Sequence, residues 1–329
     1  MGTATPDESE REPAYERAAQ KAIRDPEIAY RFAFYMVTAF FLVTTLFPFY
    51  WLLVLAVTPN DAIANMGILP KFITANGIDP SLFNPEVFLT VFEVVPFHTY
   101  VLNSLVLALM TTVIVLVIAS LAGYVFGRLT FPGRGPLMLL ILAISYFPPA
   151  AFLLPLFRLF TGNVDIFGLS SPTIFNTPWS MVLPFSALFL PLSIFILTTF
   201  YGQIPDGLED AARIEGTTRL GALFRVIIPL SAPGVATAGV LTFISVYNEF
   251  FFSFLMSDGQ VPRLLTNFFA NQNHWSPIVK GILGYQGQYA QFYNLMAAAS
   301  IVGVLPVVIL VVIAQEKIVS GLTAGALKE

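Results

Sequence analysis

The feature that most limits how this chain can fold is a series of six apolar stretches, each long enough to cross a bilayer. A helix needs about 20 mostly apolar residues to span the hydrocarbon core. Within hydrocarbon, backbone polar groups must be paired inside the protein, so such stretches fold as helices. The sequence therefore predicts an all-α polytopic membrane protein with six transmembrane helices, at about 31–57, 104–127, 137–160, 179–201, 230–256 and 292–314.

Composition excludes several classes of site. Only 11% of the residues are charged, against about a quarter in a typical soluble domain. The chain has no cysteine, so it offers no disulfide, thiolate metal site or thiol nucleophile. Its two histidines, His98 and His274, lack the spacing of a zinc-protease pair. We therefore predict no metal site and no catalytic residues, and the net charge of −4 argues against nucleic acid as a partner.

Basic residues predict the orientation of the spans, because lysine and arginine are enriched in cytosolic loops. An N-terminus inside the cell places 12 of the 16 basic residues in inner segments. These are Arg11, Arg17, Lys21, Arg24, Arg31, Arg128, Arg134, Arg213, Arg219, Arg225, Lys317 and Lys328. An even number of spans brings the C-terminus to the same side, so we expect an N-in, C-in topology.

Residues 1–30 differ from the rest of the chain in being polar and acidic. Few apolar side chains and many carboxylates are typical of segments that cannot bury a core. We expect a solvated, partly disordered cytosolic tail here. Residues 31–329 are expected to form one transmembrane domain in contact with the lipid bilayer. The acidic residues of the tail are Asp7, Glu8, Glu10, Glu12, Glu16, Asp25 and Glu27.

Prolines lie within the third to the sixth predicted spans. A proline within a helix removes a hydrogen bond, although neighbouring helices can pair the freed carbonyl group in a membrane. The pattern fits either ordinary kinks in a packed bundle or pivots around a pathway, and the sequence leaves both open. The prolines concerned are Pro148, Pro149, Pro155, Pro184, Pro191, Pro233 and Pro306.

The inner loop at about 202–229 has the pattern of two short helices joined by a turn. Asp206 followed by Glu209 matches an N-terminal capping pattern. Leu208, Ala211 and Ala212 follow with helical spacing and form one small apolar face.

The second half of the loop has its own helical signals. Gly216 can end the first helix in a left-handed conformation. Thr217 or Thr218 can cap the second helix, and Pro229 marks the turn into the fifth span. The apolar stripe of the second helix is Leu220, Leu223, Phe224 and Ile227. Such a helix pair fits a groove of a partner protein or the surface of the bilayer, and amphipathicity alone does not separate the two.

The same loop resembles the EAA signature of ABC importer permeases, E-A-A-x3-G-x9-I-x-L-P. Asp210, Ala211 and Ala212 are followed after three residues by Gly216, and nine residues later comes a Val-Ile-Ile-Pro run that ends at Pro229. The spacing is intact, and the loop lies before the fifth span, as in the family. The resemblance implies that Glu209, Asp210, Ala211, Ala212, Gly216 and Pro229 couple the chain to an ATPase.

Three positions of the signature differ from its usual form. Asp210 replaces Glu, Val226 replaces Ile, and Ile228 replaces Leu. Since Asp210 has the shorter reach, an ionic contact to the ATPase would be rearranged or taken over by Glu209.

Further motifs resemble carbohydrate permeases of the maltose-transporter type. These are Asn103-Ser104, the run Tyr247-Asn248-Glu249-Phe250, and the terminal segment Gly-Leu-Thr-Ala-Gly-Ala-Leu-Lys at 321–328. The resemblance covers the chain from the first span onward. It implies that Gly321, Thr323, Gly325 and Lys328 contact the ATPase pair.

The resemblance implies a MetI-like permease fold in the plasma membrane of a prokaryotic cell. It also implies an ABC ATPase dimer, a second permease chain (favouring a heterodimer) and an extracytoplasmic solute-binding protein as partners. None of the five lysines follows a glycine, so the chain lacks the P-loop of an ATPase. We expect no enzyme activity and no cofactor in this chain, with ATP and magnesium bound by the partner.

The implied substrate is a sugar or oligosaccharide, and two alternatives remain. One is a polyol or a glycerol phosphate, carried by the same fold. The other is an ion-coupled secondary transporter, which the nearly charge-free span centres disfavour.

The residues expected along a substrate pathway are Asn103, Tyr146, Asn248 and Glu249. For Glu249, a structural role and a pathway role both remain open, since it falls near the outer interface. The outer loop 257–291 is rich in amides and aromatic rings, which suits contact with a sugar or its carrier, although a plain hydrated loop has the same composition.

Overall fold

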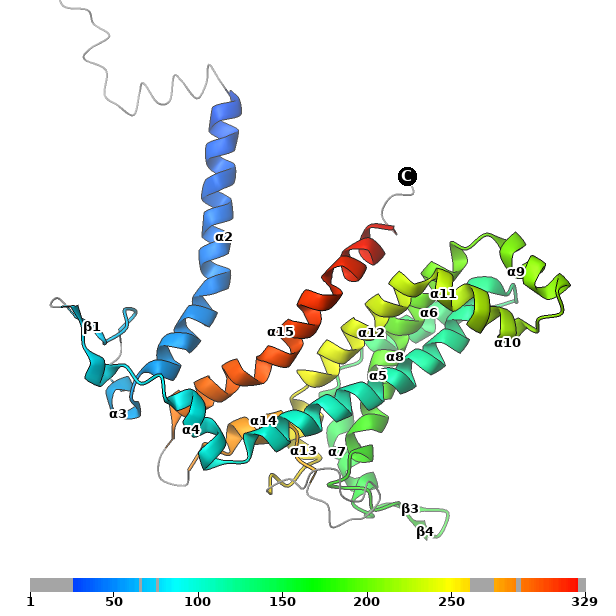
Figure 1. The fold of residues 1–329 in the computed structure, drawn as a ribbon. Coiled ribbons are helices and arrows are strands. Elements are labelled where there is room, and N and C mark those ends of the chain that lie inside the picture. Colours follow the sequence, from blue (N-terminus) through cyan, green and yellow to red (C-terminus); the bar gives the residue numbers. More distant parts are fainter. Residues whose placement is uncertain (1–25, 65–66, 75–76, 261–274, 288–290, 325–329) are drawn as a thin grey trace, which may run out of the picture.

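The computed structural model describes residues 26–64, 67–74, 77–260, 275–287 and 291–324, and the chain there is almost entirely helical (Figure 1). Four predicted spans are single helices, long and apolar enough to cross a membrane. They are α2 (Pro26–Val57), α5 (Phe97–Arg128), α8 (Trp179–Gly202) and α15 (Tyr293–Ala324). These four span predictions are confirmed by length and composition.

The other two predicted spans are broken helices. The third consists of α6 (Arg134–Ser145) and α7 (Ala150–Phe160), bent by 84°. The break falls at Pro148 and Pro149, because proline disfavours a helical conformation in the residue before it. In the fifth, the segment from Arg219 to Leu230 and α12 (Ala232–Tyr247) meet at 83°. Counting each bent pair as one span gives up to six, which is the predicted number, and the second bend lies directly after Pro229, where the sequence predicts a turn.

The remaining elements are short and join the spans. They are α3 (Asn60–Ile63), β1 (Ile73–Thr74), β2 (Gly77–Ile78), a 3₁₀ turn at Pro80–Leu82, α4 (Val87–Val94), β3 (Asp165–Ile166), β4 (Leu169–Ser170), α9 (Asp206–Ile214), α10 (Arg219–Ala222), a π-helical turn at Leu223–Ile227, α11 (Ile228–Leu230), α13 (Phe251–Leu255) and α14 (Ile278–Leu283). β1 pairs with β2, and β3 pairs with β4, each as a two-residue antiparallel hairpin.

α5 begins at Phe97, seven residues before the predicted start of the second span, because its polar first turns are paired inside the protein. The Asn103 amide donates to the Ser276 carbonyl at 3.2 Å, and Ser104 Oγ accepts from the Ile278 N–H at 2.8 Å. Hydropathy alone places this polar stretch outside the span.

α5 and α8 cross closely at two glycines of α5. A Cβ at Gly123 would lie 2.9 Å from Leu197 Cβ, and one at Gly127 would lie 3.0 Å from the Thr198 carbonyl oxygen. Small residues four apart let two membrane helices approach at backbone distance. The two neighbours of the glycines on the next face of α5 are Tyr124 and Arg128, so this crossing also fixes their position.

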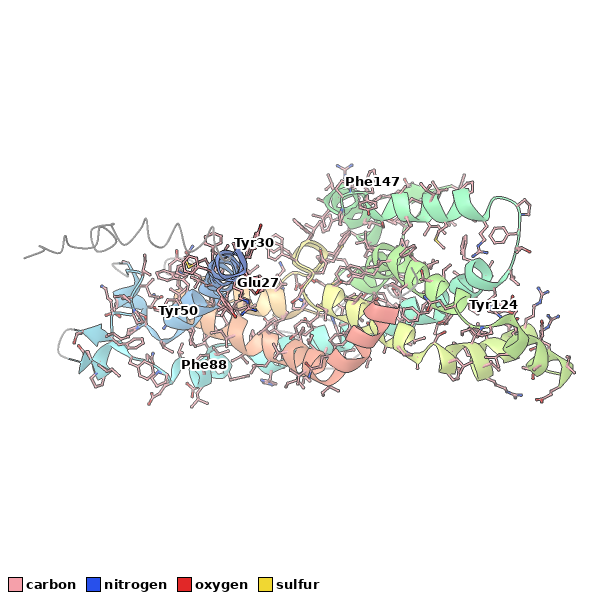
Figure 2. The ribbon with its side chains drawn as sticks, turned by 90° about the horizontal axis from the view of Figure 1, so that it is seen from above. Glu27, Tyr30, Tyr50, Phe88, Tyr124 and Phe147 are labelled. Atoms are coloured by element: carbon pink, nitrogen blue, oxygen red, sulfur yellow. The ribbon has the colours of Figure 1, made fainter. Side chains whose placement is uncertain are left out.

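The first and last spans close the fold. Asn60, just after α2, donates to the Gln291 carbonyl at 3.0 Å and accepts from the Tyr293 N–H at 3.0 Å. Only the end of α2 is packed: Val54 and Ala56 are buried, whereas the side chains from Tyr30 to Tyr50 are exposed. Figure 2 shows Tyr30 and Tyr50 on this helix, which stands apart from the layer formed by α6 and α7 around Phe147.

The elements divide between two ends of the bundle. α9 and α10 lie at the same end as the start of α2 and the end of α15, and the β3–β4 hairpin, α4 and α14 lie at the opposite end (Figure 1). This arrangement matches the even number of crossings expected from the sequence.

Candidate functional site

α9 begins differently from the prediction. The residue before its first turn is Pro205, with extended backbone and no side-chain cap, and Asp206 is already helical. The Asp206 carboxylate turns back and lies 3.0 Å from Arg128 Nη1. The predicted capping role of Asp206 was therefore wrong, because a cationic side chain at the end of α5 attracts the carboxylate away from the backbone N–H groups.

Glu209 faces the interior of the chain. Its carboxylate accepts a hydrogen bond of 2.5 Å from the Tyr124 hydroxyl and one of 2.9 Å from Arg128 Nε. Arg128 also donates from Nη1 to the Ile204 carbonyl at 2.6 Å. Its side chain is only 4% exposed, so one buried guanidinium joins the end of α5 to both the loop before α9 and the helix itself. Figure 2 labels Tyr124 at this end of the bundle.

The electrostatics of this cluster favour ionised Glu209. Burial acts to raise the pKa of the Glu209 carboxyl. The hydrogen bonds from Tyr124 and Arg128, together with the positive charges of Arg128 and Arg213, outweigh burial and lower the pKa below its ordinary value of 4.5. Glu209 is thus a fixed negative charge at neutral pH.

The C-terminal end of α9 confirms the predicted role of Gly216. Gly216 has φ of +88°, its N–H donates to the Arg213 carbonyl, and the Thr217 N–H donates to the Ala212 carbonyl. This pair of bonds is the Schellman motif, which favours glycine at the left-handed position. Thr218 caps α10 by accepting a hydrogen bond from the Gly221 N–H at 3.1 Å. It is one of the two residues predicted to cap the second helix.

The opposite face of α9 is uncovered. Asp210, Ala211 and Ile214 lie on this face and are exposed, Ile214 by 87%. Ala212 is half-buried at its edge, and Leu208 lies outside it, beside Phe200 and Pro233. The face contains the first two residues of the EAA-like signature. Glu209 points away from it, so the idea that Glu209 replaces Asp210 in an outward ionic contact does not fit this geometry.

The predicted stripe of the second helix is split between two surfaces. Leu223 and Ile227 are fully buried, whereas Leu220 and Phe224 are each 57% exposed. The π-helical turn at Leu223–Ile227 adds a residue to the helical repeat, which shifts the stripe. Pro229 lies in α11 and is exposed, directly before the bend into α12.

Some of the residues predicted to matter at the two termini and in the outer loop lie outside the described residues. Gly321 and Thr323 lie in the last turns of α15, whereas Gly325 and Lys328 lie outside the described residues. The acidic tail, as far as residue 25, and the amide- and aromatic-rich segment 261–274 also lie outside them.

The four pathway candidates differ in their surroundings. Asn103 is buried and bonded to Ser276, and Tyr146 is exposed at the end of α6. Asn248 ends α12. Glu249 accepts bonds from the N–H groups of the three residues 251–253, at 2.8, 3.0 and 3.3 Å, and so caps α13. The structural role left open for Glu249 is thus that of a helix cap, and its role in a substrate pathway stays a prediction.

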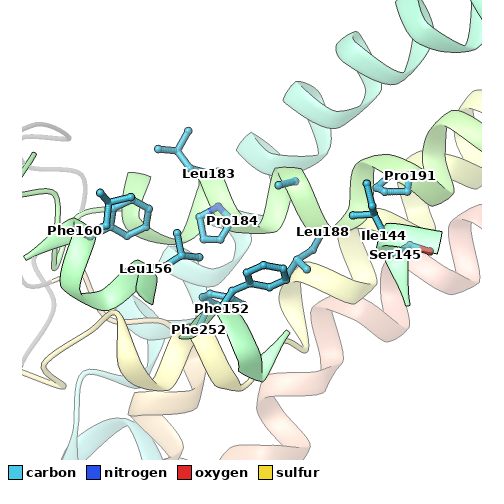
Figure 3. Close-up of a pocket in the computed structure, with 12 residues that line it drawn as sticks. Ile144, Ser145, Phe152, Leu156, Phe160, Leu183, Pro184, Leu188, Pro191 and Phe252 are labelled. Atoms are coloured by element: carbon cyan, nitrogen blue, oxygen red, sulfur yellow. The ribbon is translucent and has the colours of Figure 1, made fainter. Parts of the chain in front are cut away.

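A pocket of about 350 Å³ lies at the break between α6 and α7, against α8 and α13 (Figure 3). Ser145 is the only lining residue with a polar side chain. Sugar hydroxyls need hydrogen-bond partners when they leave water, so this pocket is not by itself a sugar site. Its other lining residues are Ile144, Phe152, Leu156, Leu159, Phe160, Leu183, Pro184, Ala187, Leu188, Pro191 and Phe252.

Sequence reasoning missed Tyr124 and Arg128. Arg128 entered only as one of the basic residues that set the topology, and Tyr124 was not considered. Their spacing of four places them on one face at the end of a span, and that spacing was visible in the sequence. Their shared partner Glu209, which lies 85 and 81 residues further along the chain, was not visible as a partner.

Comparisons with known proteins identify the family. Residues 119–323 match the model of the binding-protein-dependent transport system inner membrane component. The sulfoquinovosyl glycerol transport system permease protein SmoH of Agrobacterium fabrum is 36% identical over 294 residues, which cover 89% of this chain and 93% of the relative. The trehalose/maltose transport system permease protein MalG of Thermococcus litoralis is 31% identical, with 86% and 91% covered.

A solved structure supports the fold. A bacterial ABC transporter involved in the import of the acidic polysaccharide alginate has a chain that aligns with a TM-score of 0.65 at 16% identity, covering 89% of this chain and 97% of that one. The family model begins in the last third of α5 and covers every later span. The chain therefore belongs to the inner membrane components of binding-protein-dependent transport systems, as a multi-pass permease subunit with the MetI-like fold.

Proposed function

We propose that the uncovered face of α9 is the docking surface for an ATPase, and that the solute carried is a sugar or oligosaccharide. The proposal that α9 binds an ATPase rests on the division of this helix into two faces. Glu209 holds the helix to α5, while Asp210, Ala211 and Ile214 face away from the chain. A short helix with small and apolar residues on its free face fits a groove in a partner.

The charged residues around the free face of α9 indicate which kind of partner groove would bind it. Arg213, Arg219 and Arg225 are exposed beside α9 and α10, and Asp210 lies 3.7 Å from Arg213 Nη1. A partner groove with an apolar floor and carboxylates at its rim would complement this surface. Hydrolysis of ATP would take place in that partner, which supplies the nucleotide and magnesium.

Relatives support the choice of solute. The permeases named for sulfoquinovosyl glycerol and for trehalose and maltose align along most of their length with this chain. A polyol or glycerol phosphate remains the alternative within the same fold. In the proposed assembly, a second permease chain completes the pathway, and a solute-binding protein meets the end of the bundle with the β3–β4 hairpin.

The first test is purification of the tagged chain from native membranes in a gentle detergent, with partners identified by mass spectrometry. Recovery of a P-loop ATPase and a second six-span chain supports the assembly, and a co-purified binding protein can be screened against sugars and polyols. Recovery of this chain alone, under conditions that keep a known importer intact, would overturn the proposal.

A matched pair of variants tests the docking face. Ala211→Arg places a long cation on the exposed face without touching the chain's interior, so ATPase recovery and ATP-driven uptake should be lost while membrane insertion is normal. Ala211→Ser changes the same position with little change in volume and should keep both. Uptake that continues in Ala211→Arg would remove this face from the coupling mechanism.

A further inference from the structure

We propose that Arg128, Glu209 and Tyr124 lock α9 to the end of α5, so that the docking helix and the second span move as one rigid body. This inference deepens the proposed function and rests on it for its transport readout. α9 is joined along the chain to α8 before it and to α10 after it. The three side chains add a connection to a span that is far away in the sequence.

The geometry of Arg128 makes this connection stiff. A guanidinium has five donors in a fixed plane. Arg128 donates hydrogen bonds to the Ile204 carbonyl and the Glu209 carboxylate, at 2.6 and 2.9 Å, and forms an ion pair with the Asp206 carboxylate at 3.0 Å. These acceptors belong to both the loop before α9 and its first turns, so rotation of α9 relative to α5 would break several charge-assisted bonds together.

Burial makes the connection costly to break. Arg128 is 4% exposed and Glu209 is 7% exposed as a residue, so separating them leaves a charge without a partner in a poorly hydrated site. Tyr124 donates to the second carboxylate oxygen, which fixes the orientation of the carboxylate. The contact of Asp206 differs, because that side chain is 89% exposed and is hydrated whether or not the pair forms.

The base of the connection is rigid as well. Gly123 and Gly127 hold α5 against α8 at backbone distance, immediately beside Tyr124 and Arg128. A displacement of α9 is therefore passed to α5 and α8 together. The structure assigns Tyr124, Arg128 and Glu209 as positioning residues that act through α9, without a contact to ATP or to the solute.

The absence of cysteine from the chain permits a direct distance test. Nitroxide labels at Gly207→Cys on α9 and Val125→Cys on α5 report the separation of the two elements in the complete transporter, reconstituted in nanodiscs. Both positions are at least partly exposed. The wild-type pair should give one narrow distance distribution that does not change between nucleotide-free and ATP-bound states.

Glu209→Gln and Arg128→Lys should broaden that distribution. Gln keeps the shape but removes the charge, and Lys keeps the charge but loses the planar fork. Asp206→Asn is the matched control, since it changes an exposed carboxylate on the same guanidinium, and its distribution should stay narrow. A wild-type distance that shifts with nucleotide, or a narrow distribution in Glu209→Gln, overturns the rigid-body proposal.

A functional readout separates this inference from the proposed function. In the two broadened variants, the ratio of substrate-stimulated to basal ATPase rate should fall by about tenfold, within the usual range for coupling between distant sites, while basal hydrolysis persists. If the wild-type transporter shows no ATP-dependent uptake, the proposed function fails. If the wild type is coupled and Glu209→Gln is equally coupled, only the lock fails.

Discussion

At the scale of single residues, α9 shows how much depends on side chains that a motif does not include. The EAA-like signature begins at Asp210, yet the residue that orients the helix is Glu209, one position earlier. Its neighbour Asp210 is exposed. Two adjacent carboxylates therefore have different tasks because their side chains point about 100° apart around one short helix.

The effect of a substitution at Gly216 should depend on whether the new residue can adopt a left-handed backbone conformation, and not on the size of its side chain. A Cβ there meets no atom within 4 Å, but φ is +88°, and a left-handed conformation costs an ordinary residue about 1–2 kcal/mol. Gly216→Val should fray the end of α9 and abolish uptake, and Gly216→Asn should retain more activity. Hydrogen exchange of the α9 amides and vesicle uptake measure both effects. Gly207→Ala is the control, because Gly207 has an ordinary helical backbone. An equal loss of uptake in all three variants would contradict this reasoning.

Glu209 should make the stability of the chain depend on pH in a defined direction. Its pKa in the folded chain lies below the ordinary 4.5, so ionised Glu209 stabilises the fold at higher pH, and this contribution is lost as pH falls through the folded pKa. The difference in thermal midpoint between wild type and Glu209→Gln should be large at pH 7 and shrink below about pH 4.5. A difference that does not vary from pH 7 to pH 3.5 would show that the charge plays no part.

At the scale of elements, hydropathy located the spans but not their breaks. α2, α5, α8 and α15 are visible as long apolar runs, whereas the bends of 84° and 83° depend on how prolines and a single residue, Ser231, are placed between packed neighbours. The capping of α13 by Glu249 was also unpredictable from hydropathy. A glutamate near an interface fits a cap and a pathway equally well until the backbone around it is known.

Glu249 should contribute to the stability of α13. Its carboxylate accepts from the N–H groups of Phe251, Phe252 and Ser253, and losing a helix cap costs about 0.5–2 kcal/mol. Glu249→Ala should lower the thermal midpoint, and Glu249→Gln should fall between, since it keeps one acceptor oxygen. Solute affinity of the assembled transporter should change little. A lost affinity with an unchanged midpoint would instead support the pathway role.

The α5–α8 crossing should be sensitive to small increases in volume. A Cβ at Gly127 would lie 3.0 Å from the Thr198 carbonyl oxygen and 3.1 Å from Tyr201 Cβ, and overpacking costs about 1–3 kcal/mol. Gly127→Val should therefore lower the midpoint of unfolding by detergent titration. Gly135→Ala, on α6 with open space around it, should leave the midpoint unchanged. Equal stability of the two variants would show that the helices can move apart freely.

At the scale of the whole molecule, the sequence predicted the class, the number of crossings and the family, because each depends on composition or on spacing along the chain. It could not predict contacts between distant segments. The Arg128–Glu209 pair, the Asn103–Ser276 bond and the Asn60 bonds each join residues that only the folded chain brings together.

Single cysteines should establish the orientation of the two ends of the bundle. Ile214 on α9 and Phe167 in the β3–β4 turn are both strongly exposed, and the chain has no native cysteine. In vesicles that contain this chain without its ATPase, a membrane-impermeant maleimide should label Phe167→Cys when they are right-side-out and Ile214→Cys when they are inverted. Labelling of both positions from one side would reject the predicted N-in, C-in topology.

The pairing of α2 with α15 has a consequence for how the chain is made. About 235 residues separate the end of α2 from the start of α15, so at the usual rates of synthesis α2 leaves the ribosome roughly 10–50 s before its neighbour exists. During that interval α2 rests in lipid. The apolar surface of α2 is stable in lipid, because acyl chains are as apolar as the side chains of neighbouring helices. Asn60 can form its two bonds to residues 291 and 293 only at the end of translation, so the last span to emerge completes the packing of the first.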